Sequence, residues 1–327
     1  MRYGRLMHLV DVVVVSYNSE DQLRGCIEPL VALPDVRVTV VDSASTDRSV
    51  ASVSELPATT VPLSENRGFG HAANVGWRSG AGPLVLFVNP DARIGEAALR
   101  RLAAVAAENP TVGAVAPRIV GTEGELDFSL RRFPRLRSTY AQALFLHRLF
   151  PRAEWSDELV RDPEAYARAG TPDWASGACL LVKRAALERL GGFDEGFFLY
   201  CEDLDLCRRL RGAGYELRYE PQAVVVHEGG ASAPRSSLLP VLATSRVRYA
   251  QKHQAPVVAL LERLGVALGS LTHALGSRGG LPARVGHARS LARALSARPG
   301  TTSRPTSARR AAEPSRRRRR PLRGPGG

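Results

Sequence analysis

Apolar and polar positions along the chain follow two periods, one typical of buried strands and one typical of helices. A short β-branched run at Asp11–Ser16 predicts a strand buried on both faces, and Ser19–Leu33 then carries apolar residues at helical spacing. The same order returns later, with a helix expected at Glu96–Glu108 and strands at Val36–Val41, Thr59–Leu63, Leu84–Val88 and Val112–Ile119. Strands that alternate with helices predict an α/β fold with a Rossmann-like, mostly parallel central sheet flanked by helices.

The C-terminal part follows a different pattern. Val257–Leu275 has the spacing of an amphipathic helix, which would dock on the folded domain or lie in a membrane interface. Two charged residues interrupt its apolar run, so we expect no membrane-spanning helix. Residues 278–327 are rich in Arg, Pro, Gly and Ser, a composition that favours disorder. We therefore expect a main domain at 1–250, an amphipathic helical segment at 251–277 and a disordered basic tail at 278–327.

The charge of the chain is concentrated in that tail. The sequence has 45 Lys and Arg against 32 Asp and Glu, a formal net charge of +13, and the whole excess lies in residues 278–327. The tail is then either a solvated segment without a partner or a segment attracted to an anionic membrane surface. The folded part has no basic stripe with interleaved aromatic residues, which argues against nucleic acid as the partner.

Cysteine spacing and the N-terminus bear on the compartment. No CxxC pair or zinc spacing occurs among Cys26, Cys179, Cys201 and Cys207. This excludes a recognisable disulfide framework and favours a reducing cytosol. The first residues run directly into a strand pattern and show no signal-peptide cleavage site. We expect a cytoplasmic protein, with peripheral attachment to the inner face of the cell membrane as a further expectation.

Polar residues follow several predicted strands directly. In such sheets the ligand crevice lies beyond the carboxyl ends of the strands. The residues at these ends are Ser16, Tyr17, Asn18, Asp42, Asn89 and Asp91. The sequence contains neither GxGxxG after the first strand nor GxxxxGK[ST], which excludes the dinucleotide fingerprint and the Walker loop.

The stretch "NRGFGHAANVG" precedes a predicted helix. Gly68 and Gly70 stand where the backbone must approach something closely, and the amides at the helix N-terminus would face a diphosphate. A simple helix-entry loop explains the same glycines. Arg67 is either a phosphate contact or an ordinary surface residue.

Three carboxylates crowd into four residues of "YCEDLDL", namely Glu202, Asp203 and Asp205. They stand at the first turn of a predicted amphipathic helix, where the helix dipole stabilises negative charge and lowers a pKa. Neighbouring carboxylates raise one another's pKa, and the sequence leaves open which effect prevails. The cluster is therefore either a rigidly mounted general base or a set of favourable first-turn residues.

Six blocks carry a resemblance to a known family. They are "VVVVSYNSEDQL", "VVDSASTDRSV", "NRGFGHAANVGW", "LFVNPDA", "WASGACLLVKRAALERLGGFDEGFFLYCEDLDLCRRLRGAGY" and "VVVHEGGAS". In this order they resemble family 2 glycosyltransferases of the GT-A fold, and within that family bacterial rhamnosyltransferases that build cell-wall or surface polysaccharide. The resemblance implies inverting transfer of a sugar from a nucleoside diphosphate donor to an acceptor hydroxyl, with a divalent metal.

The resemblance also assigns the donor and metal sides. It places Asp42 against the base or ribose of the donor, where a turn-capping role is the alternative. The other donor contacts it implies are Ser16, Tyr17, Asn18, Asn66, Arg67, Gly68, Asn89 and Asp91. Asn89 replaces the first Asp of the family's Asp-any-Asp motif, so Asp91 is the carboxylate left to hold Mg²⁺ or Mn²⁺. His227, after a strand expected at Ala223–Val226, is the second ligand that the resemblance implies, although a His at a strand end is more often structural.

On the acceptor side, the resemblance places the general base at Asp203, with Glu202 beside it. Trp174, Gly177 and Asp205 are expected to shape the acceptor site, with a core position as the alternative for Trp174. Residues 127–170 lack clear periodicity and are expected to form a flap over the acceptor or a lipid-facing surface. The expected donor is dTDP-L-rhamnose and the expected acceptor is lipid-linked or polysaccharide. A non-catalytic nucleotide-sugar or nucleic-acid binding protein is the alternative, but a binder needs no base.

Overall fold

A computed structural model describes residues 9–229, 235–276 and 280–297. Its central feature is a sheet with these strands: β1 (Val10–Ser16), β2 (Val36–Asp42), β3 (Thr59–Pro62), β4 (Leu84–Val88), β5 (Ala92–Ile94), β6 (Val112–Val120), β9 (Cys179–Lys183) and β10 (Glu216–His227). Within the described residues the strand order is β3-β2-β1-β4-β9-β6-β10-β5. β9 runs antiparallel to β4 and β6, β5 runs antiparallel to β10, and the other pairings are parallel. The predicted mostly parallel α/β sheet is confirmed.

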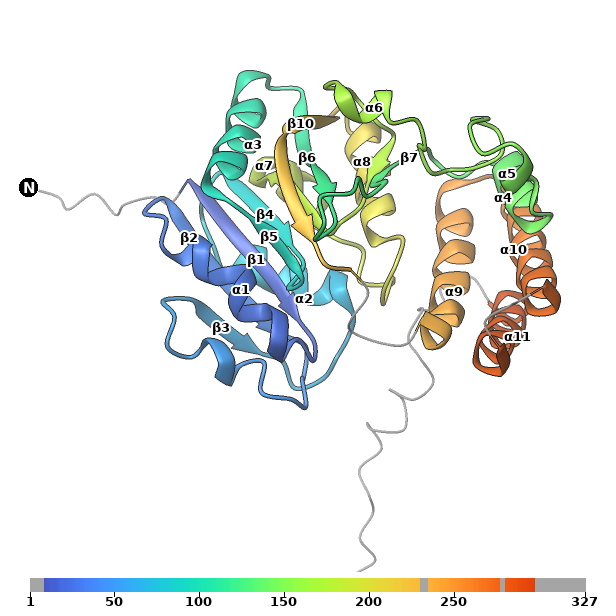
Figure 1. The fold of residues 1–327 in the computed structure, drawn as a ribbon, viewed down its shortest axis with the longest axis horizontal. Coiled ribbons are helices and arrows are strands. Elements are labelled where there is room, and N and C mark those ends of the chain that lie inside the picture. The colour runs from blue at the N-terminus through green and yellow to red at the C-terminus, as the bar shows by residue number, and fades with distance from the viewer. Residues whose placement is uncertain (1–8, 230–234, 277–279, 298–327) are drawn as a thin grey trace, which may run out of the picture.

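Helices cover both faces of this sheet (Figure 1). They include α1 (Glu20–Val31), α2 (Phe69–Arg78), α3 (Glu96–Glu108), α7 (Arg184–Leu190) and α8 (Glu202–Gly212), with a short 3₁₀ turn at Ala51–Val53. Apolar residues of α1 and α3 pack with Val12 and Val14 of β1, whereas those of α2, α7 and α8 pack with Val13. Successive valines of β1 thus pack into the apolar cores on opposite faces of the sheet, which explains the uninterrupted apolar run of this strand.

Residues 127–170 contain short elements. These are β7 (Leu130–Arg131), α4 (Leu136–Ala143), α5 (Leu146–Leu149) and α6 (Glu164–Ala167), and β7 pairs with β8 (Trp174–Ala175). Ion pairing between Glu158 and Arg246, and a 2.6 Å hydrogen bond from Thr139 to Glu262, fasten this segment to the C-terminal helices. The segment expected to be a flap is therefore held by buried polar contacts.

Three helices form the C-terminal end: α9 (Arg235–His253), α10 (Pro256–Gly276) and α11 (Gly280–Ser296). The predicted boundary at residue 250 falls inside α9, and the prediction of disorder from 278 is wrong for 280–296. That stretch is rich in Ala, Leu and Arg, which are good helix formers, and it packs against α9 and α10. Residues 298–327 lie outside the described part of the chain, so the predicted disorder there is untested.

Candidate active site

The polar strand ends meet at one edge of the sheet. Because β1, β2, β4 and β10 run in the same direction, their carboxyl ends bring Ser16, Asp42, Asn89 and His227 to this edge. Ser16 and Asp42 are register neighbours in the β1–β2 pair. β9 begins at the same edge, since Cys179 pairs with Val88. The crevice position predicted from the strand order is where these side chains lie.

The loops after β1 and β2 are hydrogen-bonded to each other. Asp42 accepts a hydrogen bond from the Ser45 N–H at 3.0 Å, and Asn18 accepts one from the Thr46 N–H at 2.9 Å. Asn18 has a positive φ of 51°, a conformation that Asn tolerates better than most residues. The turn-capping interpretation of Asp42 is thus what the structure shows, while its contact with a donor stays a prediction.

Ser16 and Tyr17 differ in exposure. Ser16 is fully buried, and its hydroxyl has no hydrogen-bond partner among the described residues. The Tyr17 side chain next to it is exposed. The Tyr17 side chain is therefore available to a ligand, whereas Ser16 is enclosed by protein.

Gly68 and Gly70 make the close approach that the sequence predicts, but the neighbour is protein backbone. A Cβ on Gly68, whose φ is +99°, would lie 2.2 Å from the Phe198 carbonyl oxygen, and one on Gly70 would lie 3.2 Å from Phe193 Cβ. The Phe69 N–H donates a 2.9 Å hydrogen bond to that Phe198 oxygen. The α2 N-terminus therefore docks the 193–198 loop, which favours the helix-entry interpretation over a diphosphate site.

Asn66 and Arg67 stand beside this contact. Asn66 accepts a hydrogen bond from the Gly68 N–H at 2.9 Å, which supports the turn. Arg67 is about half exposed and lies 3.7 Å from Glu195 and 3.8 Å from Glu65. Surface ion pairs of this kind are weak, so the Arg67 guanidinium remains free to turn toward a phosphate.

His227 lies between two carboxylates at the end of β10. Its Nε2 is 3.3 Å from Asp91 Oδ1, and its Nδ1 is 3.7 Å from Asp127 Oδ2. Asp127 and Asp91 raise the pKa of His227 to about 9, against the opposing effect of burial. Because Nδ1 faces Asp127, that carboxylate orients the ring and leaves Nε2 directed at Asp91, the arrangement found around His ligands of metals.

Asp91 and His227 are donors of the kind that divalent cations take, but the described residues do not complete a ligand set. Among the residues that the structure describes, no group of three or more His, Cys, Asp and Glu side chains could hold a metal ion. One carboxylate and one imidazole supply an oxygen and a nitrogen donor, a combination that suits Mn²⁺ better than Mg²⁺. A cation here would take its remaining ligands from the donor and water.

Asp203 stands at the first turn of α8 and is fixed by backbone donors. Its Oδ2 accepts a hydrogen bond from the Gly177 N–H at 3.0 Å, and its Oδ1 accepts one from the Leu204 N–H at 2.8 Å. Burial raises the pKa of Asp203, and these two hydrogen bonds only partly offset it. The residue as a whole is half-buried.

Glu202 is buried beside Asp203. Burial, followed by the charge of Asp203, raises the pKa of Glu202 well above its usual range. One of its oxygens, Oε2, has no hydrogen-bond partner among the described residues. Tyr200 and Cys201, just before it, both have positive φ values, 66° and 65°. Two successive strained residues at a helix start indicate that the surrounding structure fixes this turn, as is common at functional sites.

Asp205 does not face the crevice, which corrects the acceptor-side prediction. Its side chain is fully buried, with 2.7 Å contacts to Arg209 Nε, Lys252 Nζ and His253 Nε2. Burial acts to raise its pKa, but the His253 hydrogen bond and the two cationic groups outweigh burial and lower the pKa to about 2. On a helix, residues 203 and 205 point about 200° apart, so Asp203 binds the Gly177 N–H while Asp205 ties α8 to α9.

Trp174 occupies the core position that was the alternative for it. The indole is 9% exposed and belongs to the main apolar cluster. Its Nε1–H donates to the Arg132 carbonyl at 3.0 Å, and the Arg131 guanidinium lies 5.3 Å from the ring centroid. Stacking of a sugar on this ring is therefore not supported. Gly177 does serve the site, through its N–H.

A backbone hydrogen bond connects the loop that carries Asn89 and Asp91 to the loop that binds Asp203. The Asn89 N–H donates a 2.8 Å hydrogen bond to the Ala178 carbonyl, one residue from the Gly177 N–H that binds Asp203. Asp91 lies two residues beyond Asn89.

Sequence reasoning missed Asp127 and Arg131 as site residues. Asp127 contacts His227, and the positive charge of Arg131 acts to lower the pKa of Asp203. Asp127 lies seven residues after β6, so the strand-end rule pointed to this region but not to a particular residue.

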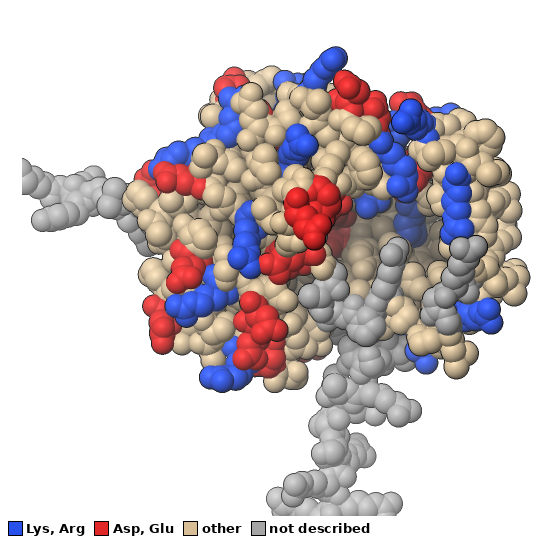
Figure 2. Space-filling view, viewed as in Figure 1, with Lys and Arg blue, Asp and Glu red and all other residues tan. Residues whose placement is uncertain are grey.

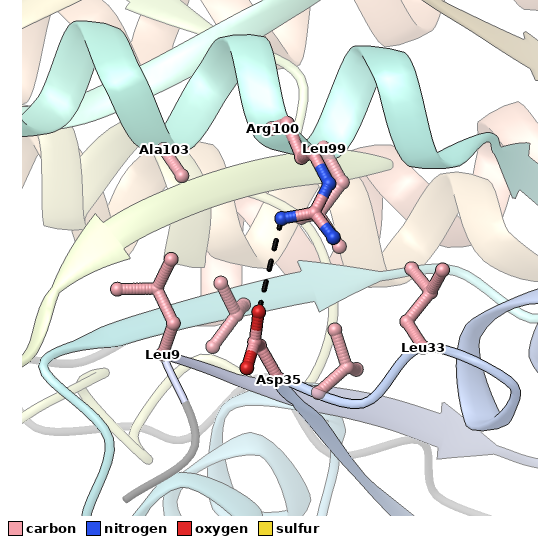
Figure 3. A pocket seen from close by; sticks show the side chains of 8 residues that line it. Leu9, Leu33, Asp35, Leu99, Arg100 and Ala103 are labelled. Atoms are coloured by element: carbon pink, nitrogen blue, oxygen red, sulfur yellow. Dashed lines mark ion pairs between the residues drawn. The ribbon is translucent and has the colours of Figure 1, made fainter.

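A small pocket lies at the opposite edge of the sheet and is unrelated to these groups. Leu9, Leu33 and Leu99 line it, and Asp35 Oδ2 lies 3.8 Å from Arg100 Nη1 across its mouth (Figure 3). It is found at the amino ends of β1 and β2, where parallel sheets do not place their ligands.

Fold and strand-end site together define a GT-A glycosyltransferase. The fold resembles that of the mannosyltransferase PcManGT from Pyrobaculum calidifontis in complex with GDP-Man and Mn²⁺, with a TM-score of 0.53 and 20% identity over 88% of this chain and 86% of that chain. The model of the family described as glycosyl transferase family 2 matches residues 11–190. The chain belongs to this family and is a glycosyltransferase.

Curated relatives narrow the similarity further. The chain is 33% identical over 242 residues to the N-acetylglucosaminyl-diphospho-decaprenol L-rhamnosyltransferase of Mycobacterium tuberculosis, covering 69% of this chain and 78% of that protein. It is 26% identical over 231 residues to the rhamnosyltransferase WbbL of Escherichia coli, covering 67% of this chain and 83% of that protein. The predicted resemblance to rhamnosyltransferases is confirmed, and the purely binding alternative is set aside.

Proposed function

We propose that this enzyme transfers L-rhamnose from dTDP-L-rhamnose to a hydroxyl of a lipid-linked N-acetylglucosaminyl diphosphate in cell-envelope glycan synthesis. The donor and acceptor rest on the 33% identity to the decaprenol-linked rhamnosyltransferase. The activity rests on Asp203, whose carboxylate the Gly177 N–H fixes at the strand-end edge. We place the reaction in the cytoplasm, consistent with four cysteines that are all buried and free.

Asp203 would act as general base in a single displacement with inversion. The acceptor oxygen forms a bond to the anomeric carbon while its proton passes to the Asp203 carboxylate. The bond between the anomeric carbon and the diphosphate oxygen breaks, and the electron pair leaves with the diphosphate. A raised pKa makes Asp203 a stronger base than an ordinary carboxylate, and the two backbone donors hold it in one orientation.

Asp91 and His227 would hold a divalent cation on the donor side. When bound, the cation neutralises charge on the leaving diphosphate. Asp127 would hold the imidazole through Nδ1, so that Nε2 stays directed toward Asp91. The loop that carries Asp42 and Asn18 would receive the nucleoside, and Tyr17 would lie against it.

A transfer assay tests the assignment. Purified protein with Mn²⁺ or Mg²⁺ is given dTDP-L-rhamnose, UDP-N-acetylglucosamine or GDP-mannose, with a prenyl diphosphate-linked N-acetylglucosamine as acceptor. We expect a rhamnosylated lipid by mass spectrometry only with dTDP-L-rhamnose. Transfer from a different donor would overturn the sugar assignment but leave the glycosyltransferase intact. A thermal-shift series with the same nucleotides reports donor binding without the acceptor.

A further inference from the structure

Helix α10 carries its large apolar side chains on the outside. Its exposed residues are Val257 (70% exposed), Leu260 (53%), Leu261 (38%), Leu264 (45%), Leu271 (44%) and Leu275 (75%). They recur at spacings of three, four and seven residues, which places them on one face of the helix. A surface helix of a globular protein normally turns such a face inward, so this leucine face is an unpartnered apolar surface of the described protein.

The inner face of α10 is small and polar. Ala259, Glu262, Gly265 and Ser270 are buried there. A Cβ on Gly265 would lie 2.7 Å from Thr139 Cγ2, and Glu262 accepts a 2.6 Å hydrogen bond from the Thr139 hydroxyl. Close packing against α4 therefore fixes which face of α10 points outward.

Neighbouring elements extend the apolar surface. On α11, Leu281, Val285 and Leu295 are 74%, 38% and 50% exposed and share one face. The α5 turn exposes Leu149 and Phe150, and α5 lies next to α4 and α10 at one end of the molecule (Figure 1). Phe145, which precedes α5, contacts His273 of α10 with ring centroids 4.4 Å apart.

Residues 298–327 do not offer a cover for this surface. Residues 298–327 are mostly Arg, Pro, Gly, Ser and Thr, with Leu322 as the single large apolar residue. A segment of that composition cannot replace the contacts that a stripe of leucines needs. We therefore look for the occupant of the leucine face outside residues 298–327, in an external partner.

Charge decides between the external partners. Over α10 and α11 the one acidic residue is Glu262, which is buried, whereas Arg284 and Arg289 of α11 are exposed beside its apolar face. In Figure 2 the end of the molecule formed by these helices is mostly tan, with blue side chains among the tan ones. Two copies of this surface would bring arginines against arginines. An anionic lipid surface offers an apolar interior and negative head groups together.

The packing of α10 favours a position on a membrane surface over a position across the membrane. Within the described residues, α10 is the one helix long and apolar enough to span a bilayer by length and composition. Spanning would detach it from α4 and transfer Glu262 and Arg263 into hydrocarbon, which is costly. Lying in the interface keeps the buried face on α4 and places the leucines among the acyl chains.

We propose that the leucine face of α10, extended by α11 and the α5 turn, docks this enzyme on an anionic membrane surface. The docking does not depend on the proposed donor or acceptor, because it rests on the described helices alone. It differs from attraction through the Arg-rich tail, since the apolar stripe supplies the insertion.

Vesicle flotation with the full chain tests the proposal. The vesicles contain either phosphatidylcholine alone or phosphatidylcholine with phosphatidylglycerol, and no acceptor. The test variant is Leu264→Glu with Leu271→Glu. The matched control is Leu9→Glu with Val224→Glu, because these two residues are each 43% exposed, close to the 45% and 44% of Leu264 and Leu271, and lie on the sheet domain. Circular dichroism and thermal melting confirm that each variant is folded.

We expect the unaltered chain and the control to float with the anionic vesicles, and the test variant to float at least tenfold less. Neutral vesicles are expected to recover little of any variant. Equal recovery of test and control variants would overturn the proposal, as would no recovery of the unaltered chain. Light scattering tests the other candidate partner, a second copy of this chain. If the unaltered chain is a dimer that the test variant dissociates, and it does not bind vesicles, the leucine face serves self-association. Loss of flotation leaves rhamnosyl transfer to a short soluble acceptor analogue unaffected, which separates this test from that of the proposed activity.

Discussion

The Asp203 carboxylate accepts a 3.0 Å hydrogen bond from the backbone N–H of Gly177, so the first turn of α8 is fastened to the loop before β9. A Cβ on Gly177 would lie 3.3 Å from Asp203 Cβ, and the absence of a side chain there permits this close approach. The two residues are 26 positions apart in the sequence, and their contact sets where a base can act.

Asp203→Asn is expected to reduce turnover at least about a hundredfold, the lower end of what a general base contributes. The amide keeps the shape and cannot take the acceptor proton. Steady-state kinetics measure turnover, and a thermal-shift titration with dTDP-L-rhamnose serves as the control, which should be unchanged. Near-normal turnover in this variant would remove Asp203 as the base.

Glu202→Gln is expected to keep more than about a tenth of the turnover, since burial and Asp203 favour the protonated, neutral form of Glu202, which Gln imitates. The same kinetic assay, run beside Asp203→Asn, distinguishes the two acids. A hundredfold loss of turnover in Glu202→Gln, with unchanged thermal melting, would identify Glu202 as the general base.

Asp205→Asn is expected to lower the free energy of unfolding at pH 7 by about 2 kcal/mol, because a pKa near 2 in the folded state lies below about 3.9 in the unfolded chain. A carboxyl group whose pKa is lower in the folded state than in the unfolded chain stabilises the fold at pH values above its unfolded pKa. This stabilisation is lost as the pH falls from about 4 through 2.

Urea unfolding at pH 7 and pH 3 measures this effect. The difference between Asp205→Asn and the unaltered protein should shrink at the lower pH. Glu108→Gln, at an exposed position on α3, is the control and should change stability by less than about 0.5 kcal/mol. An unchanged free energy of unfolding in Asp205→Asn would contradict the structural role of the Asp205–His253 contact.

His227→Ala is expected to weaken Mn²⁺ binding at least about tenfold in the presence of dTDP, because it removes the nitrogen donor opposite Asp91. Electron paramagnetic resonance of free Mn²⁺ measures the affinity. His71→Ala is a matched control, since His71 also pairs with a carboxylate, 2.8 Å from Glu195, but stands on α2. Equal Mn²⁺ affinity in both variants would exclude His227 as a ligand.

Predictions from the sequence were most accurate where local pattern dictates structure. The apolar runs of β1 and β4 and the helix Glu96–Glu108 were correctly placed, because a buried strand and an amphipathic helix each impose a period on the chain. The strand-end rule then brought Asp42, Asn89 and His227 to one edge.

The predictions failed where neighbours from distant segments decide. Trp174 and Asp205 were assigned to the acceptor side, but the structure buries the first beneath Arg131 and pairs the second with α9. Gly68 was expected to approach a diphosphate and instead approaches Phe198. Residues 280–296 were expected to be disordered, yet they pack as α11.

The sequence by itself determined the alternation of strands and helices up to Ile119, the polar residues at the strand ends and the family, because these depend on residue type and local spacing. The tertiary structure alone decided which acid faces the crevice, which glycine serves it, and that α10 presents its leucines outward. These depend on contacts between segments far apart in the sequence, such as Thr139 with Glu262, which are 123 residues apart. The burial of Trp174 and Asp205 depends on partners from distant segments, which the pattern around each residue does not contain.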